Sequence, residues 1–447
     1  MKIEIKTMGC RLNRAEAAAM TGALEAAGYE VEEKIPSISN HPSDIITQTS
    51  AISHQTSLFL LHTCTVTGAA RNEALRLIRG AKRRGAAFVI VSGCGAGTER
   101  DAFFEAGADV LIDKKNGEII GDDFYGIGRL LLSALRIDAD SGAVRTLPRF
   151  ASTRASVKIQ DGCDFRCAYC IVPDARGAPV SRPAAAVLDE IRRLAETEGF
   201  REFVLAGVNV ATWTHGGLGL CDLIARIAEI GAVSRIRLSS VEPATTERAL
   251  IDMMADVAQS KLCRTLHYPL QSADDGVLRL MRRRYTVARY AEVLDYAAEK
   301  IPRLGLGADI IAGFPGESDA AFERTREFVL RRQFTNLHVF PYSERPGTPA
   351  ASMPDKIPVQ TRRERARELL AIGAEKARRF AESFIGNEAE MLVEKVGEDG
   401  VGQGWTSEYV SARVAGLTRE DCGKTLRFKV NATDDATVTG TDFTILL

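Results

Sequence analysis

Residues 157–170 read VKIQDGCDFRCAYC, a short strand pattern that runs directly into three closely spaced cysteines. Cys163, Cys167 and Cys170 have the spacing C-x3-C-x2-C, and thiolates this close on one loop can ligate three irons of a [4Fe–4S] cluster. Three protein ligands leave the fourth iron open, as catalytic metal sites require. Zinc is the alternative, but a structural zinc site usually has four ligands in paired groups, and the neighbouring sequence offers no second pair. The sequence therefore predicts an open iron–sulfur cluster at a strand end.

Further along the chain, apolar strand patterns alternate with helical patterns. The predicted strands are Val157–Gln160, Phe203–Ala206, Arg235–Ser239, Thr265–Leu270, Ala308–Ile311 and Leu337–Tyr342. Helical patterns lie between them, for example Ala184–Thr197, Leu223–Ile230, Thr286–Lys300 and Ala320–Arg332. Six βα units are too few for a complete eight-stranded barrel, so we expect a partial (βα)6 TIM-like barrel with its site at the carboxyl ends of the strands.

The first part of the chain repeats a strand followed by a helix. The pairs are Lys2–Lys6 with Ala15–Ala27, Leu58–Leu61 with Ala69–Lys82, and Phe88–Val91 with Arg100–Ala106. This alternation predicts an open parallel α/β sheet. Cys10, Cys64 and Cys94 each follow one of these strands, and parallel strands end at a shared edge, so the three can converge there. The alternative is three buried apolar cysteines, since free cysteine is commonly buried.

Two polar stretches interrupt these patterns. Residues Ile38–Ser57 are expected to be a surface insertion, and Ala139–Thr153 a domain linker. A long helical pattern covers Thr361–Ile385, and short alternating strands with Gly-rich turns follow Gly386, which is typical of a small antiparallel β-barrel. We therefore expect three domains, at residues 1–140, 150–385 and 386–447.

The overall composition limits the classes of function. The 447 residues are 45% hydrophobic and 26% charged, with a net charge of −1, so any nucleic-acid partner must be met by local basic patches. No apolar run is long enough to span a membrane and no export signal is recognised, which predicts a soluble cytoplasmic protein. Nine cysteines in such a chain favour metal or redox chemistry over a disulfide framework. Cys221, Cys263 and Cys422 lack ligand-like spacing and are expected to be incidental.

These motifs resemble the radical S-adenosylmethionine (SAM) methylthiotransferase family over nearly the whole chain. The matching segments are TMGCRLNRAEAAAM around Cys10, TCTVTGAARN around Cys64, VSGC ending at Cys94, VKIQDGCDFRCAYCIVPDARG, RIRLSSVEP (235–243), LHYPLQSADDGVLRLMRRRYT (266–286), DIIAGFPGES (309–318) and HVFPYSERPGTPA (338–350). The C-terminal segment resembles the TRAM domain of these enzymes. Within the family, Cys64-Thr-Val-Thr followed by a basic helix is most similar to the MtaB branch.

The resemblance implies a radical enzyme that inserts a methylthio group into a C–H bond. Cys163, Cys167 and Cys170 would hold the [4Fe–4S] cluster that binds and cleaves SAM, and Cys10, Cys64 and Cys94 a second, auxiliary [4Fe–4S] cluster for the added sulfur. The SAM contacts would come from strand-end residues of the barrel, although each of these could equally be a turn or cap residue: Gly207, Asn209, Ser239, Gln271, Asp309 and Gly313. His267 is expected to be structural.

For the MtaB branch the implied substrate is N6-threonylcarbamoyladenosine at position 37 of tRNA, in the anticodon stem-loop, with a flavodoxin or ferredoxin as electron donor. The same-family alternatives are isopentenyladenosine in tRNA and a ribosomal-protein aspartate. A non-catalytic iron–sulfur protein that binds RNA or transfers electrons is the alternative of another class. His62, Gly95 and Asp174 depart from the family pattern and leave the substrate pocket less defined than the clusters.

Two basic patches are candidates for RNA phosphate contact. The helical pattern of residues 69–84 and the run Arg282–Arg284 with Tyr285 carry them, the former through Arg71, Arg76, Arg79, Lys82, Arg83 and Arg84. Basic helices are more often plain solvated faces. The C-terminal segment Gly386–Leu447 has six Lys or Arg and eleven Asp or Glu, a net charge of −5, so it would have to recognise RNA by shape or by a few residues.

Overall fold

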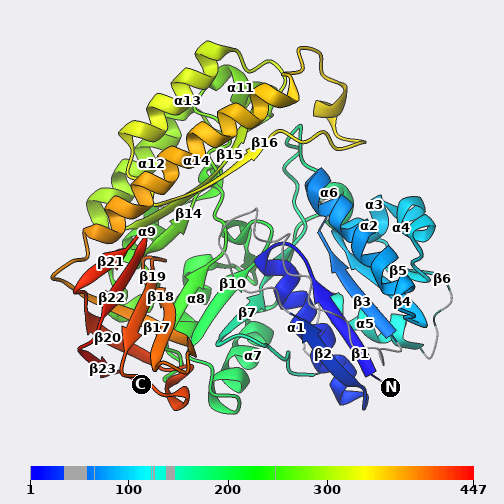
Figure 1. Cartoon of the computed structure of the whole chain (residues 1–447), viewed down its shortest axis with the longest axis horizontal. Coiled ribbons are helices and arrows are strands. Elements are labelled where there is room, and N and C mark those ends of the chain that lie inside the picture. Colours follow the sequence, from blue (N-terminus) through cyan, green and yellow to red (C-terminus); the bar gives the residue numbers. More distant parts are fainter. Residues whose placement is uncertain are drawn as a thin grey trace.

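The computed structural model describes residues 2–34, 58–64, 66–121, 123, 126–136, 146–246 and 248–446. The predicted insertion Ile38–Ser57 lies outside the described residues, as do residues 139–145 of the predicted linker. Figure 1 shows three folded parts in chain order: an N-terminal sheet in blue, a central barrel in green and yellow, and a C-terminal sheet in red.

The N-terminal part is a six-stranded sheet with the order β2-β1-β3-β4-β5-β6. Its strands are β1 (Lys2–Thr7), β2 (Glu30–Lys34), β3 (Leu58–Thr63), β4 (Phe88–Gly93), β5 (Val110–Asp113) and β6 (Glu118–Gly121). All neighbours pair parallel except β5 and β6, so the predicted open parallel sheet is confirmed with one antiparallel edge strand.

Helices cover both faces of this sheet, as the strand–helix alternation predicts. Helices α1 (Arg11–Ala26) and α5 (Ile127–Leu135) pack on one face, while α2 (Gly68–Arg83) and α4 (Arg100–Ala106) pack on the other. Helix α1 begins at Arg11, earlier than the predicted Ala15, because Asn13 is held by tertiary bonds that hydrophobic periodicity does not show. Its Nδ2 donates to the carbonyl oxygens of Met8 and Thr63 at 2.8 and 2.9 Å.

The central part is a partial barrel of six parallel strands. They form two hydrogen-bonded groups, β13-β10-β7 and β14-β15-β16, joined by a single bridge between Ile236 and Leu262. The strands are β7 (Arg154–Lys158), β10 (Glu202–Ala206), β13 (Arg235–Leu238), β14 (Thr265–His267), β15 (Gly305–Ala312) and β16 (Asn336–Pro341). The predicted (βα)6 barrel is thus confirmed, with strand ends that differ from the predicted ones by up to three residues.

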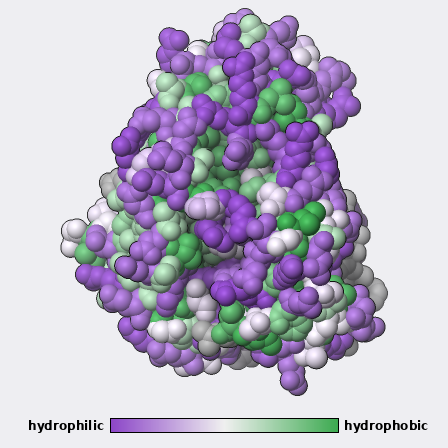
Figure 2. All heavy atoms as spheres, turned by 90° about the vertical axis from the view of Figure 1, so that its left-hand side faces the viewer, coloured by the Kyte–Doolittle hydropathy of each residue, from purple (hydrophilic) through white to green (hydrophobic). Residues whose placement is uncertain are grey.

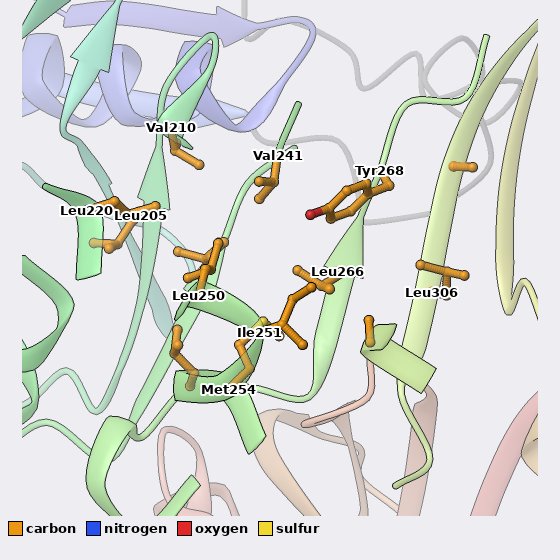
Figure 3. Close-up of a cluster of buried hydrophobic side chains, with 14 of the residues drawn as sticks. Leu205, Val210, Leu220, Val241, Leu250, Ile251, Met254, Leu266, Tyr268 and Leu306 are labelled. Carbon is orange, nitrogen blue, oxygen red and sulfur yellow. The ribbon is translucent and has the colours of Figure 1, made fainter. Parts of the chain in front are cut away.

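Helices line the outside of the barrel and bury its largest core. They are α7 (Ala184–Glu196), α8 (Leu220–Ala228), α9 (Arg248–Ala255), α12 (Val287–Lys300), α13 (Asp319–Arg331) and α14 (Val359–Glu382). Alternate strand residues such as Leu205, Leu266 and Leu306 point toward these helices, where Leu250 and Met254 of α9 meet them (Figure 3). The remaining strand residues therefore face the interior of the barrel.

The C-terminal part is a seven-stranded sheet with the order β21-β22-β19-β18-β17-β20-β23. Its strands are β17 (Glu388–Val396), β18 (Val401–Thr406), β19 (Ser411–Ala415), β20 (Thr425–Lys429), β21 (Ala432–Asp434), β22 (Thr437–Gly440) and β23 (Phe443–Ile445). The pairing is antiparallel as predicted, except that β19 and β22 run parallel. That pair joins strands distant in the chain, which local turn signals cannot predict.

The turn between β18 and β19 lies against the amino-terminal ends of the barrel strands. We call residues 406–410 the floor turn. Arg237 Nη2 donates to the Thr406 carbonyl oxygen at 3.0 Å, and Arg264 N donates to Ser407 Oγ at 2.8 Å. A Cβ on Gly305, the first residue of β15, would lie only 1.9 Å from the Glu408 carbonyl oxygen, so the two backbones are in direct contact. The C-terminal sheet thus closes the lower end of the barrel.

The surface gives no sign of a membrane-crossing segment. Among the described residues no helix is both long and apolar enough to span a bilayer. On the face that Figure 2 shows, hydrophilic residues predominate and the apolar side chains gather in and around a central hollow.

Candidate iron–sulfur and SAM site

Cys163, Cys167 and Cys170 lie on the loop between β8 (Gln160–Asp161) and α6 (Val172–Arg176). Backbone bonds hold this loop on two sides. Cys163 N donates to the Gly177 carbonyl oxygen at 3.1 Å, and Ala168 N donates to the Met281 carbonyl oxygen at 2.9 Å. The three thiols are therefore fixed at the upper end of the barrel, beyond β7.

A buried arginine contacts this triad. Arg283 Nη1 donates to Cys167 Sγ at 3.3 Å, and its Nη2 lies 2.6 Å from both carboxylate oxygens of Glu242. Burial, together with the neighbouring charges of Cys167 and Cys163, raises the pKa of the Cys170 thiol to about 12. A cation beside these sulfurs favours the negatively charged thiolate form.

Cys10, Cys64 and Cys94 converge at one edge of the N-terminal sheet. Cys10 is the N-cap residue of α1, Cys64 follows β3, and Cys94 opens α3 (Cys94–Thr98) directly after β4. Burial, together with the charges of Cys94 and Cys10, raises the pKa of Cys64 to about 12. A Cβ on Gly9 would lie 2.5 Å from Cys64 Cβ, so glycine is needed for this close approach. Three cysteines from distant parts of the sequence thus form a second triad.

Arg176 connects the two triads. It lies six residues after Cys170 in the chain, and its Nε donates to Cys94 Sγ at 3.1 Å. Its other nitrogens donate to Asn13, Glu16 and Asp161 at 2.7–3.1 Å. No local sequence pattern indicates this contact, because it joins residues 82 positions apart.

The buried carboxylate of Glu16 is the centre of this contact between the N-terminal sheet and the barrel. Lys114 and Lys158 bind its Oε1 at 2.6 and 3.1 Å, and His62 bonds its Oε2 at 3.1 Å. Burial opposes ionisation of Glu16, but Arg176, Lys114 and Lys158 hold its pKa well below the ordinary value. The charged network fixes the edge that carries Cys94 against the loop that carries Cys163.

The donor sets fit iron–sulfur clusters better than single metal ions. Within the described ranges, only His267, Asp309 and His338 place three ligand atoms of His, Cys, Asp or Glu within 4.8 Å of one another. Neither thiol triad is therefore closed around one ion, as tetrahedral zinc would require with Zn–S bonds of about 2.3 Å. Three thiolates with an N–H donor to one sulfur are the environment of an iron–sulfur cluster.

Comparison with known proteins identifies the family of this chain. The Radical SAM superfamily model matches residues 157–329, and the model of the uncharacterized protein family UPF0004 matches residues 2–113. The threonylcarbamoyladenosine tRNA methylthiotransferase MtaB of Rickettsia prowazekii is 32% identical, over 88% of this chain and 88% of that protein. The tRNA-2-methylthio-N(6)-dimethylallyladenosine synthase of Syntrophotalea carbinolica is 30% identical, over 89% of this chain and 90% of that protein. The chain belongs to the radical SAM methylthiotransferases.

Two further comparisons agree with this family. MtaB of Bacillus subtilis is 29% identical over 96% of this chain and 93% of that protein. Among solved structures, the radical SAM methyltransferase TsrM of Kitasatospora setae superposes with a TM-score of 0.54 at 16% identity, over 78% of this chain and 75% of that chain. The latter supports the fold alone. As a radical SAM methylthiotransferase, the protein is an enzyme that uses SAM and a [4Fe–4S] cluster.

The predicted SAM contacts of this methylthiotransferase lie in different settings, most of them at the upper ends of the barrel strands. The backbone N–H groups of Val208 and Asn209 donate to Gln160 Oε1 at 2.9 and 3.0 Å, which fixes the turn at Gly207. Ser239 Oγ is buried and has no hydrogen-bond partner in the described part of the chain. An orphaned hydroxyl at a strand end is available to a ligand.

Other predicted contacts have a structural reason. Gln271 has a positive φ of 62° and bonds β15 through its backbone, by N to the Asp309 carbonyl oxygen at 2.8 Å. A Cβ on Gly313 would lie 2.5 Å from Arg362 Cγ, so packing against α14 already accounts for this glycine. The carboxylate of Asp309 lies between two histidines, His267 and His338, instead of at the strand end.

The basic helix α2 is less available to RNA than its sequence indicates. Five of the six predicted cations lie in α2, and Arg84 is its C-cap residue. Three of the five form ion pairs: Arg71 with Glu99, Arg76 with Glu73 and Lys82 with Asp109, at 2.5–2.7 Å. Within α2 the pairing leaves Arg79 and Arg83 as the better candidates for phosphate contact.

Sequence reasoning missed several residues that shape the site. Arg176 reaches it from a distant element, and periodicity carries no signal for such a contact. Arg283 was predicted to contact RNA phosphate, but the structure buries it against Glu242 and Cys167, so that part of the prediction is wrong. The grouping of His267 and His338 with Asp309 could have been predicted. All three alternate with apolar residues on predicted neighbouring strands, so their side chains face the same side of the sheet.

Proposed function

We propose that this protein is a tRNA methylthiotransferase that converts N6-threonylcarbamoyladenosine at position 37 to its 2-methylthio derivative. The single observation that carries the proposal is the presence of two thiol triads, with Arg176, which follows the Cys163–Cys170 loop, donating to Cys94 of the other triad. The relatives named for threonylcarbamoyladenosine and for dimethylallyladenosine match at 29–32% and 30% identity, so identity leaves both tRNA substrates as candidates. The Cys64-Thr-Val-Thr segment supports the former.

The two triads have separate tasks in this proposal. Cys163, Cys167 and Cys170 hold the cluster that supplies the reductive cleavage of SAM. Cys10, Cys64 and Cys94 hold a second [4Fe–4S] cluster that supplies the sulfur. Arg283 and Arg176 each direct an N–H to one ligand sulfur, which stabilises the thiolate form in a buried site.

In this proposal helix α2 and the C-terminal sheet bind the tRNA. Arg79 and Arg83 on α2 contact phosphates of the anticodon stem-loop, and the C-terminal sheet acts as a TRAM domain. We propose a flavodoxin or ferredoxin as electron donor, a cytoplasmic location, and domain limits at residues 1–140, 150–385 and 386–447.

Two cysteine variants test the division of labour. Cys167→Ala should abolish cleavage of SAM to 5′-deoxyadenosine, whereas Cys64→Ala should retain cleavage and lose methylthio transfer. The anaerobically reconstituted wild-type protein should hold about eight irons per chain, as two four-iron clusters require. Cys422→Ala, which removes an exposed thiol outside both triads, is the control and should change neither readout.

Equal loss of cleavage in Cys167→Ala and Cys64→Ala would contradict the separate tasks. An iron content of about four per chain in the wild-type protein would contradict the presence of a second cluster.

A further inference from the structure

The interior face of the barrel carries a polar cluster that no cysteine triad uses. His267 on β14, Asp309 on β15 and His338 on β16 come from three neighbouring parallel strands. His267 Nε2 and His338 Nδ1 lie 2.9 and 3.2 Å from the same atom, Asp309 Oδ1. The two imidazole rings are 4.9 Å apart between centroids. One carboxylate oxygen therefore fixes both rings; we call these three residues the inner polar wall.

The alternation of the strands shows that this wall faces the barrel interior. Leu266, Ala308 and Val339, which alternate with the three polar residues, are buried in the outer core. The side chains of His267, Asp309 and His338 keep 19%, 25% and 27% of their surface exposed. A Cβ on Gly307 would lie 2.5 Å from His267 Nδ1, so a glycine makes room for that ring.

The wall lies between the floor turn and the cysteine loop. Along β15, Asp309 is four residues above Gly305, which touches the floor turn. At about 3.3 Å per strand residue, this separation is roughly 13 Å. Phe314, two residues past the end of β15, packs its ring against Tyr169 of the cysteine loop. A nucleoside bound near the cysteine loop would therefore direct an N6 substituent that enters the barrel toward the wall.

The wall has hydrogen-bonding capacity that the protein does not use. Both contacts of the Asp309 carboxylate go to Oδ1, and among the described residues none bonds its Oδ2. A dimethylallyl group would bury this oxygen without a partner, which costs free energy. A threonylcarbamoyl group brings carbamoyl N–H groups, a hydroxyl and a carboxylate, which can pair with the carboxylate and the imidazoles.

We infer that His267, Asp309 and His338 bind the polar N6 substituent of the substrate nucleoside and select it over an apolar one. This inference rests on the proposed function and assigns the residues that choose between its two tRNA substrates. Asp309 and His338 lie directly opposite each other in the register of β15 and β16, so they act as one unit.

The test uses binding of three anticodon stem-loop RNAs to the reconstituted enzyme. The RNAs carry N6-threonylcarbamoyladenosine, N6-dimethylallyladenosine or unmodified adenosine at the same position. The wild-type protein should prefer the first RNA over the other two. His338→Phe keeps the ring and removes both nitrogens, so that preference should fall at least about tenfold. His338→Asn retains a donor near the Nδ1 position and should restore part of it.

His215→Phe, on the separate β11–β12 hairpin, is the matched control and should keep the full preference. Thermal unfolding of each variant verifies that it folds. Wild-type preference that survives in His338→Phe would overturn the inference while leaving the proposed function intact. Equal binding of all three RNAs by the wild-type protein, or preference for the dimethylallyl RNA, would overturn the proposed substrate itself. One divalent metal ion per chain, present in the wild-type protein and lost in His338→Phe, would show that the wall binds a metal instead.

Discussion

At the scale of single residues, buried arginines donate hydrogen bonds to the cysteine sulfurs of both triads. Arg176 and Arg283 are each almost fully buried, and each donates to one cysteine sulfur while a carboxylate balances its charge. A buried cation without such partners would be strongly unfavourable. Each arginine thus places a positive charge beside one sulfur of a triad, Cys94 or Cys167, and so favours its thiolate form.

Tyr409 of the floor turn is a second residue held by arginines. Burial raises its pKa, but Arg11, Arg154 and Arg237 lower it more, and the resulting pKa is about 7. Because the folded pKa lies below the value of about 10 in the unfolded chain, the group stabilises the fold fully above pH 10. That contribution falls as the pH decreases and is lost below about 7.

We therefore expect the stability advantage of the wild type over Tyr409→Phe to grow between pH 7 and pH 9, by at most about 1.4 kcal/mol per pH unit. Urea unfolding at several pH values measures it. A tyrosinate absorbance difference between the two proteins should titrate near pH 7, and an advantage independent of pH over that range would refute the assignment.

At the scale of elements, the end of β4 is the most constrained turn of the N-terminal triad. Gly93 has φ 92° and ψ −166°, and a Cβ there would lie 2.3 Å from the Thr63 carbonyl oxygen. The next residue is Cys94, so the turn at this glycine positions the Cys94 thiol at the edge of the N-terminal sheet where Cys10 and Cys64 also lie. Only glycine adopts such backbone angles readily.

Backbone strain alone should make Gly93→Ala less stable by about 1–3 kcal/mol, and the steric clash with Thr63 should add to that loss. The midpoint of urea unfolding measures the change. Gly85→Ala is the control, because Gly85 has φ 84° but nothing within 4 Å of the added Cβ, and it should cost less. Equal losses in the two variants would show that the close approach to Thr63 is unimportant.

The elements also show what the sequence could and could not predict. The strands of the barrel and the cysteines at their ends follow from alternation and from the rule that parallel strands end together. Asn13, His62 and Glu16 are buried polar residues whose partners lie on other elements, so hydrophobic periodicity does not indicate their burial. Likewise the floor turn joins residues about 170 positions apart, and no local pattern encodes it.

At the scale of the whole molecule, the C-terminal sheet closes the lower end of the barrel, and Arg176 and Glu16 join its upper end to the N-terminal sheet. The three parts are therefore packed together around the interior of the barrel, which the inner polar wall lines. The net charge of −1 means that RNA binding depends on a few local cations instead of a general field.

Replacing Arg79 and Arg83 together by Gln should weaken tRNA binding and reduce the slope of log affinity against log salt by about 2, one for each lost phosphate contact. Arg331→Gln on α13, an exposed arginine paired with Glu327, should leave the slope unchanged. A double variant with the wild-type slope would exclude α2 from the RNA interface.

The central claim is that this enzyme adds a methylthio group to a tRNA nucleoside. The most direct measurement is mass spectrometry of nucleosides from total tRNA of the wild type and of a strain that lacks the gene. We predict that 2-methylthio-N6-threonylcarbamoyladenosine disappears in the deletion strain and that its precursor, N6-threonylcarbamoyladenosine, accumulates. Unchanged tRNA nucleosides would contradict the claim and direct attention to a ribosomal-protein aspartate as the substrate.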